Sequence, residues 1–129
     1  MTSSDLQLRL GPVREAMLNL HRNLLDAERM AYERLHGRVP GSADALQLAI
    51  HDPWFAWLRP LTALLVAMDE ALLEDSPEAD ARVPSLLEAA RAMVRADEEG
   101  SDFQQRLFEF IQRSPDVAIA EVSAARLLR

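Results

Sequence analysis

The sequence predicts an all-α fold, a helical bundle of about six helices built on two long antiparallel helices at about 12–36 and 53–75. Three observations predict this class: six segments carry apolar residues at helical spacing, strand patterns are lacking beyond Gly11, and the connections are short. The chain has 129 residues, enough for one domain that buries roughly two-thirds of the surface exposed by the unfolded chain. We therefore expect residues 1–129 to form a single helical domain.

The first long helix is expected to follow a short extended arm. Apolar and polar residues alternate over 6–10, and Gly11 should end the arm. From about 12 to 36 the apolar residues form two neighbouring stripes on a helix, which predict two neighbouring elements. One stripe consists of Val13, Met17, Leu20, Leu24, Ala27 and Ala31, and the other of Leu18, Leu25, Tyr32 and Leu35. Gly37 is expected to end this helix.

The second long helix contains both tryptophans, and we expect the other helices to pack around it. Before it, Ser42 can cap a short helix that ends near His51. Asp52 can then cap the tryptophan helix, whose first turn contains Pro53. Its main apolar face consists of Trp54, Trp57, Leu61, Leu64, Met68 and Ala71. Because Pro60 removes one backbone hydrogen bond, we expect a kink there in one continuous helix rather than two separate helices.

An acidic linker is expected at about 75–84, between the two halves of the chain. Residues 69–80 contain six acids and no base, and Ser76–Pro77 lies within this run. Three shorter helices should follow, each opened by a serine that can cap it: Ser85, Ser101 and Ser114. The first two of these serines have the spacing of a capping box, with Glu88 and Gln104 as their partners.

The composition excludes several classes of site and partner. Cysteine is absent, so disulfides, zinc–thiolate sites, iron–sulfur clusters and thiol catalysis are excluded. The net charge of −7 arises in residues 61–129, which contain seven arginines and fourteen acids, and this argues against nucleic acid as a partner. The longest apolar run, at 61–68, is too short to cross a membrane, and the first residues lack the pattern of a secretory signal. We therefore expect a cytoplasmic protein that binds no membrane.

Four polar residues are expected near the contact between the two long helices. With a rise of about 1.5 Å per residue, His21 and Asp69 fall at one level, and Glu28 and Arg59 fall nearer to the tryptophans. One hypothesis is a polar layer of His21, Glu28 and Asp69 that holds a metal ion or acts as acid and base. The other, which we favour, is two ordinary contacts, His21 with Asp69 and Glu28 with Arg59, because buried charged groups are usually paired.

The two tryptophans lie three residues apart on one face of a helix, and such a pair usually belongs to the core. The alternative is a ligand pocket lined by Trp54 and Trp57, with His21 and Asp69 as further ligand-binding candidates. We assign no catalytic residue and no cofactor, because the sequence lacks nucleotide-binding, calcium-loop and catalytic-triad patterns. An enzyme would require a water-accessible pocket that joins His21 or His51 to an acid.

We therefore predict a non-enzymatic protein–protein interaction or assembly module; the alternative is a bundle that binds a small apolar ligand or a metal ion between the long helices. We expect a homodimer, because the apolar faces outnumber the neighbours that one small chain supplies. The candidate surfaces are the first long helix and the helix from Pro115 to Leu128, where Ile119 and Val122 lie opposite Ala120 and Ala124. A different protein is the other partner considered.

Overall fold

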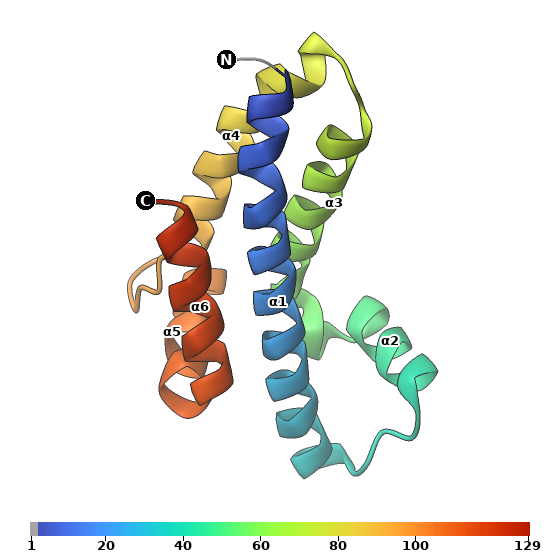
Figure 1. The fold of residues 1–129 in the computed structure, drawn as a ribbon. Helices are drawn as coiled ribbons and strands as arrows, with labels where there is room; N and C mark the ends of the chain where they lie inside the picture. Colours follow the sequence, from blue (N-terminus) through green and yellow to red (C-terminus); the bar gives the residue numbers. More distant parts are fainter. Residues whose placement is uncertain (1–2) are drawn as a thin grey trace.

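The computed structural model describes residues 3–129, and every regular element in that range is a helix (Figure 1). The elements are α1 (Ser3–His36), α2 (Ser42–His51), the 3-10 helix η1 (Pro53–Leu58), α3 (Arg59–Leu73), α4 (Pro77–Met93), α5 (Asp102–Arg113) and α6 (Pro115–Leu127). The prediction of an all-α bundle with six helices is thereby confirmed. Among the helices of residues 3–129, none combines the length and the apolar character needed to cross a bilayer.

The core lies around α1, which packs against η1, α3, α4 and α6 (Figure 1). The first apolar stripe of α1 forms its centre, and Met17, Leu20 and Leu24 are fully buried. Helix α3, expected to be the most enclosed, packs against η1, α1 and α4. The helix on which most of the bundle is assembled is therefore the first and not the tryptophan helix, because the longer helix offers apolar side chains to both sides of the bundle.

The expected extended arm is wrong, because α1 begins at Ser3 and continues through Gly11 and Pro12. Proline in a helix interior leaves one carbonyl without its hydrogen bond. Leu10 and Val13 are buried in the core, and they extend the stripe of Met17 by whole helical turns. Burial of these side chains offsets the local cost of the proline. The end of the helix was predicted correctly: Gly37 follows it with a φ of 85°.

The tryptophan segment divides into two helical elements that follow each other directly. Asp52 caps η1 as predicted, because its side chain accepts a hydrogen bond from the backbone N–H of Trp54 at 2.9 Å. Pro60 lies in the first turn of α3, where a missing N–H costs no intrahelical bond. The expected kink in one continuous α-helix is therefore replaced by a change from 3-10 to α-helical geometry, with Leu58 in a helical conformation at the junction.

The acidic segment is mostly helical rather than an extended linker. Helix α4 begins at Pro77, capped by the side chain of Ser76, which accepts from the N–H of Ala79. Only residues 74–76 are non-helical, and Ser85 lies inside α4 and opens no helix. Ala79 and Val83 are buried, so their packing against the bundle stabilises the start of α4. The charge pattern alone had predicted a linker there.

The last two helices begin as predicted. Ser101 and Gln104 form a complete capping box at the start of α5, in which each side chain binds the other residue's backbone N–H. Ser114 ends α5 and caps α6 through the backbone N–H of Val117. These local signals set the start of α5 and the corner between α5 and α6 without help from distant residues.

Candidate functional site

A carboxylate from α1 lies between the two indole groups of η1. The indole N–H of Trp54 donates to Oε1 of Glu28 at 2.6 Å, and the indole N–H of Trp57 donates to Oε2 of the same residue at 2.6 Å. The Glu28 side chain is almost completely covered, with an exposed fraction of 3%. Each carboxylate oxygen thus has an N–H donor, and both donors come from one short element.

The 3-10 geometry of η1 explains how one carboxylate reaches both indoles. In a 3-10 helix, residues three apart lie directly above one another, because one turn takes three residues. Trp54 and Trp57 are three apart, so their side chains leave η1 on the same side. Asp52 and Pro53 set the start of this turn, and the position of the tryptophans relative to Glu28 follows from it.

Glu28 makes no ion pair with any residue of 3–129, so only hydrogen bonds from neutral groups stabilise its carboxylate. Arg59, its expected partner, instead donates to the backbone carbonyl of Ile50 at 3.3 Å. A buried carboxylate is costly unless it is paired and hydrogen-bonded. Two charge-assisted N–H bonds supply part of that compensation. The absence of a cation leaves net negative charge at this point of the bundle.

A cavity of about 480 Å³ opens beside this carboxylate, between η1 and α5. Its walls are mostly apolar and aromatic. Its polar residues are the buried Glu28 and the exposed Asp102 and Arg106. The lining residues are Glu28, Pro53, Trp54, Ala56, Trp57, Pro60, Asp102, Phe103 and Arg106. We call this space the tryptophan pocket. Its volume lies within the range of about 300–1,000 Å³ that is typical of small-molecule sites.

Aromatic contacts hold both indoles in place. Trp57 stacks on Phe110 with ring centroids 5.6 Å apart and an interplanar angle of 10°, and it also contacts Phe103 at 5.5 Å. Trp54 meets Tyr32 edge-on, with centroids 5.7 Å apart. Neither tryptophan is fully buried, which differs from the expectation that Trp57 belongs to the core. Both side chains pack against the core on one side and line the tryptophan pocket on the other.

His21 and Asp69 each have a different partner from the one expected. Nε2 of His21 forms a hydrogen bond of 3.1 Å with Oγ1 of Thr62, whose hydroxyl also lies 3.3 Å from the carbonyl oxygen of Leu58. Burial lowers the pKa of His21 below its usual value. Asp69 accepts a hydrogen bond from Nε of Arg14 at 2.8 Å.

The proposed metal layer is not assembled by these contacts. Glu28 is held by the tryptophans, His21 by Thr62, and Asp69 by an arginine. Within residues 3–129, no group of three or more histidines and acids is arranged to hold a metal ion. Of the residues predicted from sequence, the structure therefore brings together Glu28, Trp54 and Trp57, and it places His21 and Asp69 elsewhere.

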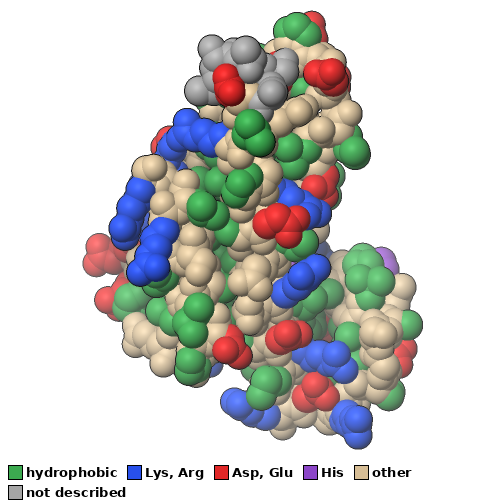
Figure 2. Space-filling model, viewed as in Figure 1, with side chains coloured by type: hydrophobic (Ala, Val, Ile, Leu, Met, Phe, Trp, Pro, Cys, Tyr) green, Lys and Arg blue, Asp and Glu red, His purple; other side chains and the backbone are tan. Residues whose placement is uncertain are grey.

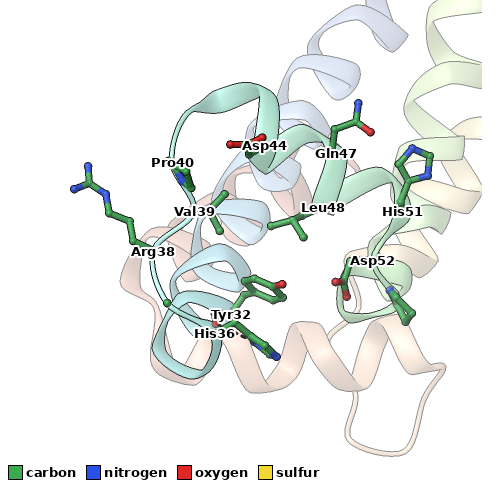
Figure 3. A pocket seen from close by; sticks show the side chains of 12 residues that line it. Tyr32, His36, Arg38, Val39, Pro40, Asp44, Gln47, Leu48, His51 and Asp52 are labelled. Atoms are coloured by element: carbon green, nitrogen blue, oxygen red, sulfur yellow. Dashed lines mark hydrogen bonds between the residues drawn. The ribbon is translucent and has the colours of Figure 1, made fainter.

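A second, more open cavity of about 610 Å³ lies between the C-terminal end of α1, the 37–41 connection and α2. Figure 3 shows Val39 and Leu48 within it, Tyr32 and His36 at one end, and Arg38 turned away. The rings of Tyr32 and His36 stack with their centroids 4.3 Å apart. We call this space the α2 pocket.

The α2 pocket contains two histidines, His36 and His51, and two acids, so it has the residue types that an enzyme would require. His51, Asp44 and Asp52 all line it (Figure 3). His51 makes no hydrogen bond to either acid, and the carboxylate of Asp52 caps η1 instead. General acid–base sites usually couple the histidine to its partner by a hydrogen bond. The pocket therefore supplies the residue types without that coupling.

Sequence reasoning missed the contribution of α5 to the tryptophan pocket. Asp102 and Arg106 are four residues apart, which is the ordinary spacing of an exposed pair on a helix surface. Phe103 lies at helical spacing from Leu107 and Phe110, which places it on an apolar face of its helix but indicates no partner. No local pattern states which helix the tryptophans contact, so only the packing of α5 against η1 reveals this wall.

The comparisons of this chain with protein-family models, curated proteins and solved structures found no match.

Proposed function

We propose that this protein is a non-enzymatic assembly module that forms a homodimer through the outer face of α2. The observation that carries the proposal is that none of the ten residues of α2 is buried. Helices of this length are marginal in water when packing does not support them. A partner that covers α2 would supply the missing support.

The contacts of α2 within the chain are few. It packs against η1 and stands apart from the main bundle (Figure 1). Its N-terminus follows Gly41, and no side chain caps it. Leu46 and Ile50 are four residues apart on one side of the helix, with exposed fractions of 57% and 49%. A second copy that covers this apolar pair would remove both side chains from water.

The two helices predicted from sequence as the dimer surface, α1 and α6, are the alternatives to α2. Helices α1 and α6 pack against each other within one chain, and Ala120 and Ala124 are buried in that contact. Ile119 and Val122 stay exposed on the outer side of α6. On the face drawn in Figure 2, hydrophobic side chains over α1 and α6 are interspersed with charged ones. Because α6 is anchored by its buried side, it needs no partner for its stability, and α2 is the better candidate.

The low charge of α2 also favours self-association through this helix. The chain has a net charge of −7, which opposes self-association. Helix α2 contains one acid, Asp44, so two copies of its outer face bring little negative charge together. Charges elsewhere on the surface are largely screened beyond about 8 Å at physiological salt. Apolar burial at Leu46 and Ile50 should therefore outweigh the repulsion.

Light scattering at micromolar concentration tests the homodimer. We expect a mass of two chains of 14.5 kDa for the wild-type protein. The double substitution Leu46→Glu and Ile50→Glu should give the mass of one chain, because it places charge in the contact. Val66→Glu is the matched control: Val66 is exposed to 52% on α3, outside the proposed surface, and this variant should remain a dimer.

Two results would contradict this proposal. The first is a wild-type mass of one chain that does not change with concentration or salt. The second is a dimer that the α2 double variant leaves intact while circular dichroism shows that the fold is retained. In the second case the contact lies on another surface, and α6 with Ile119 and Val122 becomes the region to substitute next.

Small-ligand binding is a second candidate function, and the tryptophan pocket favours it. The pocket combines aromatic walls with one buried polar group, Glu28, which is the usual composition of a ligand site. It differs from the site proposed from sequence, because neither His21 nor Asp69 lines it. Native mass spectrometry of the purified protein tests this function, and a mass increment lost in a Trp54→Ala variant would support it.

A further inference from the structure

We propose that the tryptophan pocket binds an organic cation, a quaternary ammonium or guanidinium group, against the indoles of Trp54 and Trp57, with Glu28 as the counter-charge. This inference rests on the second candidate function and names the chemical class of its ligand. It differs from the apolar ligand and the metal ion considered from sequence.

The charge of Glu28 has no cation to compensate it. Its carboxylate is 3% exposed, and its two hydrogen bonds come from neutral indoles. Within the described residues no cation pairs with it. Charge interactions are strong where water is excluded. A monocation in the adjoining pocket would neutralise this charge without displacing either indole bond.

The carboxylate of Glu28 also changes the electron density of the two indoles. A cation is attracted to the negative face of an aromatic ring, most strongly to tryptophan. An N–H bond to a carboxylate moves electron density into the ring, so both indole faces become more negative. Trp54 and Trp57 make such bonds at 2.6 Å each. The carboxylate therefore strengthens cation binding both directly and through the rings.

Both indole rings are held in place by contacts with other side chains of the chain. Trp57 stacks on Phe110, and Trp54 packs edge-on against Tyr32 and His36. A site whose side chains are already ordered pays less conformational entropy on binding. The volume of the tryptophan pocket also agrees with this ligand class. About 480 Å³ accommodates a small organic ion and is far larger than the volume of a bare metal ion.

The charges at the rim determine the selectivity. Asp102 adds negative charge at the mouth of the pocket, whereas Arg106 adds positive charge and opposes a cation. Arg106 is exposed and has neither a hydrogen bond nor an ion pair with the described residues. Its removal should therefore leave the fold intact and make the pocket more attractive to a cation. This gives a test in which a substitution improves binding.

Tryptophan fluorescence offers a direct measurement, because the two tryptophans of the chain both line this pocket. We would titrate the full chain with choline and with 3,3-dimethyl-1-butanol, its neutral carbon isostere. Choline should change the emission with a saturable curve and a Kd on the order of 1 mM or lower. The neutral isostere should bind at least about tenfold more weakly, because it lacks the charge that both the rings and Glu28 attract.

Two substitutions with opposite expected effects separate this inference from nonspecific binding. Glu28→Gln should weaken choline binding about tenfold, and Arg106→Ala should strengthen it about threefold, because each changes one charge beside the ligand. Glu70→Gln is the control: it removes an exposed charge of α3 outside the pocket and should have no effect. If Glu28→Gln fails to fold by circular dichroism, Arg106→Ala still decides the outcome.

The source of the cation is addressed by a second titration, with free methylguanidinium and with an N-acetylated, C-amidated peptide that contains one arginine. Tighter binding of the peptide would indicate a side chain of a partner protein, and equal binding would indicate a free small molecule. Both results support the inference. Equal affinity for choline and its neutral isostere, or an Arg106→Ala variant that binds choline no better, would overturn it. If native mass spectrometry then finds a neutral or anionic ligand in this pocket, ligand binding stands and only the cation class fails.

Discussion

Nε1 of Trp57 donates a hydrogen bond of 2.6 Å to Oε2 of Glu28, across 29 residues of sequence. This bond joins η1 to the C-terminal half of α1, and the equivalent bond from Trp54 uses the other oxygen. These two hydrogen bonds therefore affect both the fold and the tryptophan pocket. A change in either bond alters the packing of η1 and the charge beside the pocket.

Truncation of Trp57 should show how much this link stabilises the fold. We expect Trp57→Ala to lower the free energy of unfolding by about 3–5 kcal/mol, since it removes the stack on Phe110 and leaves one oxygen of Glu28 without its donor. Trp57→Phe retains most of the packing and should cost about 1–3 kcal/mol for the lost hydrogen bond. Urea unfolding followed by circular dichroism measures both.

The control for this prediction is Leu73→Ala, at a highly exposed position of α3. It should change the stability by less than about 0.5 kcal/mol, as substitutions on the surface usually do. A loss below about 1 kcal/mol for Trp57→Ala would show that this side chain contributes little to the fold.

The contact of Asp69 predicts a specific pattern of energetic coupling. A double-mutant cycle between Arg14 and Asp69 should give about 0.2–1 kcal/mol, the range of partly exposed ion pairs. A cycle between His21 and Asp69, which the sequence suggested as a pair, should give no coupling beyond error, because His21 is bonded to Thr62. The reverse result would mean that Asp69 turns toward His21 in solution.

His21 predicts a pH dependence of stability. Burial lowers the pKa of His21 in the folded protein below its ordinary value of 6.5. The unfolded chain therefore binds a proton more readily at this residue, and its contribution to stability is complete above pH 6.5 and lost as the pH falls toward the folded pKa. Unfolding free energies between pH 5 and 8 should decline toward acid more steeply in the wild type than in His21→Gln. Equal slopes would show that the residue is solvated in the folded state.

Glu121 of α6 should show the opposite sign. Burial raises the pKa of Glu121 above its ordinary value of 4.5, and the side chain has no hydrogen bond or ion pair with residues 3–129. A carboxylate whose folded pKa is raised destabilises the fold above its unfolded pKa. Glu121→Gln should therefore raise the melting temperature at pH 7, and this gain should disappear below about pH 4.5. A gain of equal size at both pH values would indicate an effect of packing and not of charge.

Hydrogen exchange should identify α2 as the least protected helix of the bundle. None of its residues is buried and no side chain caps its start, so its amides should exchange on the order of tenfold or more faster than those of α1 around Leu20. Its protection should increase with protein concentration if α2 forms the dimer contact. Protection of α2 equal to that of α1 in dilute solution would show that the helix is stable without a partner.

The sequence by itself determined the class of fold and those helix starts that depend on neighbouring residues. The Asp52 cap, the Ser101–Gln104 capping box and the Ser114 cap all join groups within three residues of each other, so spacing along the chain was sufficient to predict them. The apolar stripe from Val13 to Leu24 was likewise correct, because helical period alone decides which side chains share a face.

Where local preference and burial disagree, only the tertiary structure decided whether a helix forms. Gly11 and Pro12 signal a break, yet α1 passes through them because Leu10 and Val13 are buried. The acids near Asp75 signal a linker, yet α4 begins at Pro77. In both places the apolar area buried against other helices outweighs the local signal, and that area depends on which helices become neighbours.

The candidate site, too, was predicted in part from the sequence and decided in part by the tertiary structure. The spacing of Trp54 and Trp57 indicated that they share a face, and Glu28 was identified as a polar residue near them. That both indoles donate to Glu28, and that Phe103 and Arg106 of α5 complete the pocket, depends on how the fold brings together residues that lie far apart in the sequence. Periodicity describes one helix at a time, whereas the partners of a buried carboxylate are set by the packing of three elements around it.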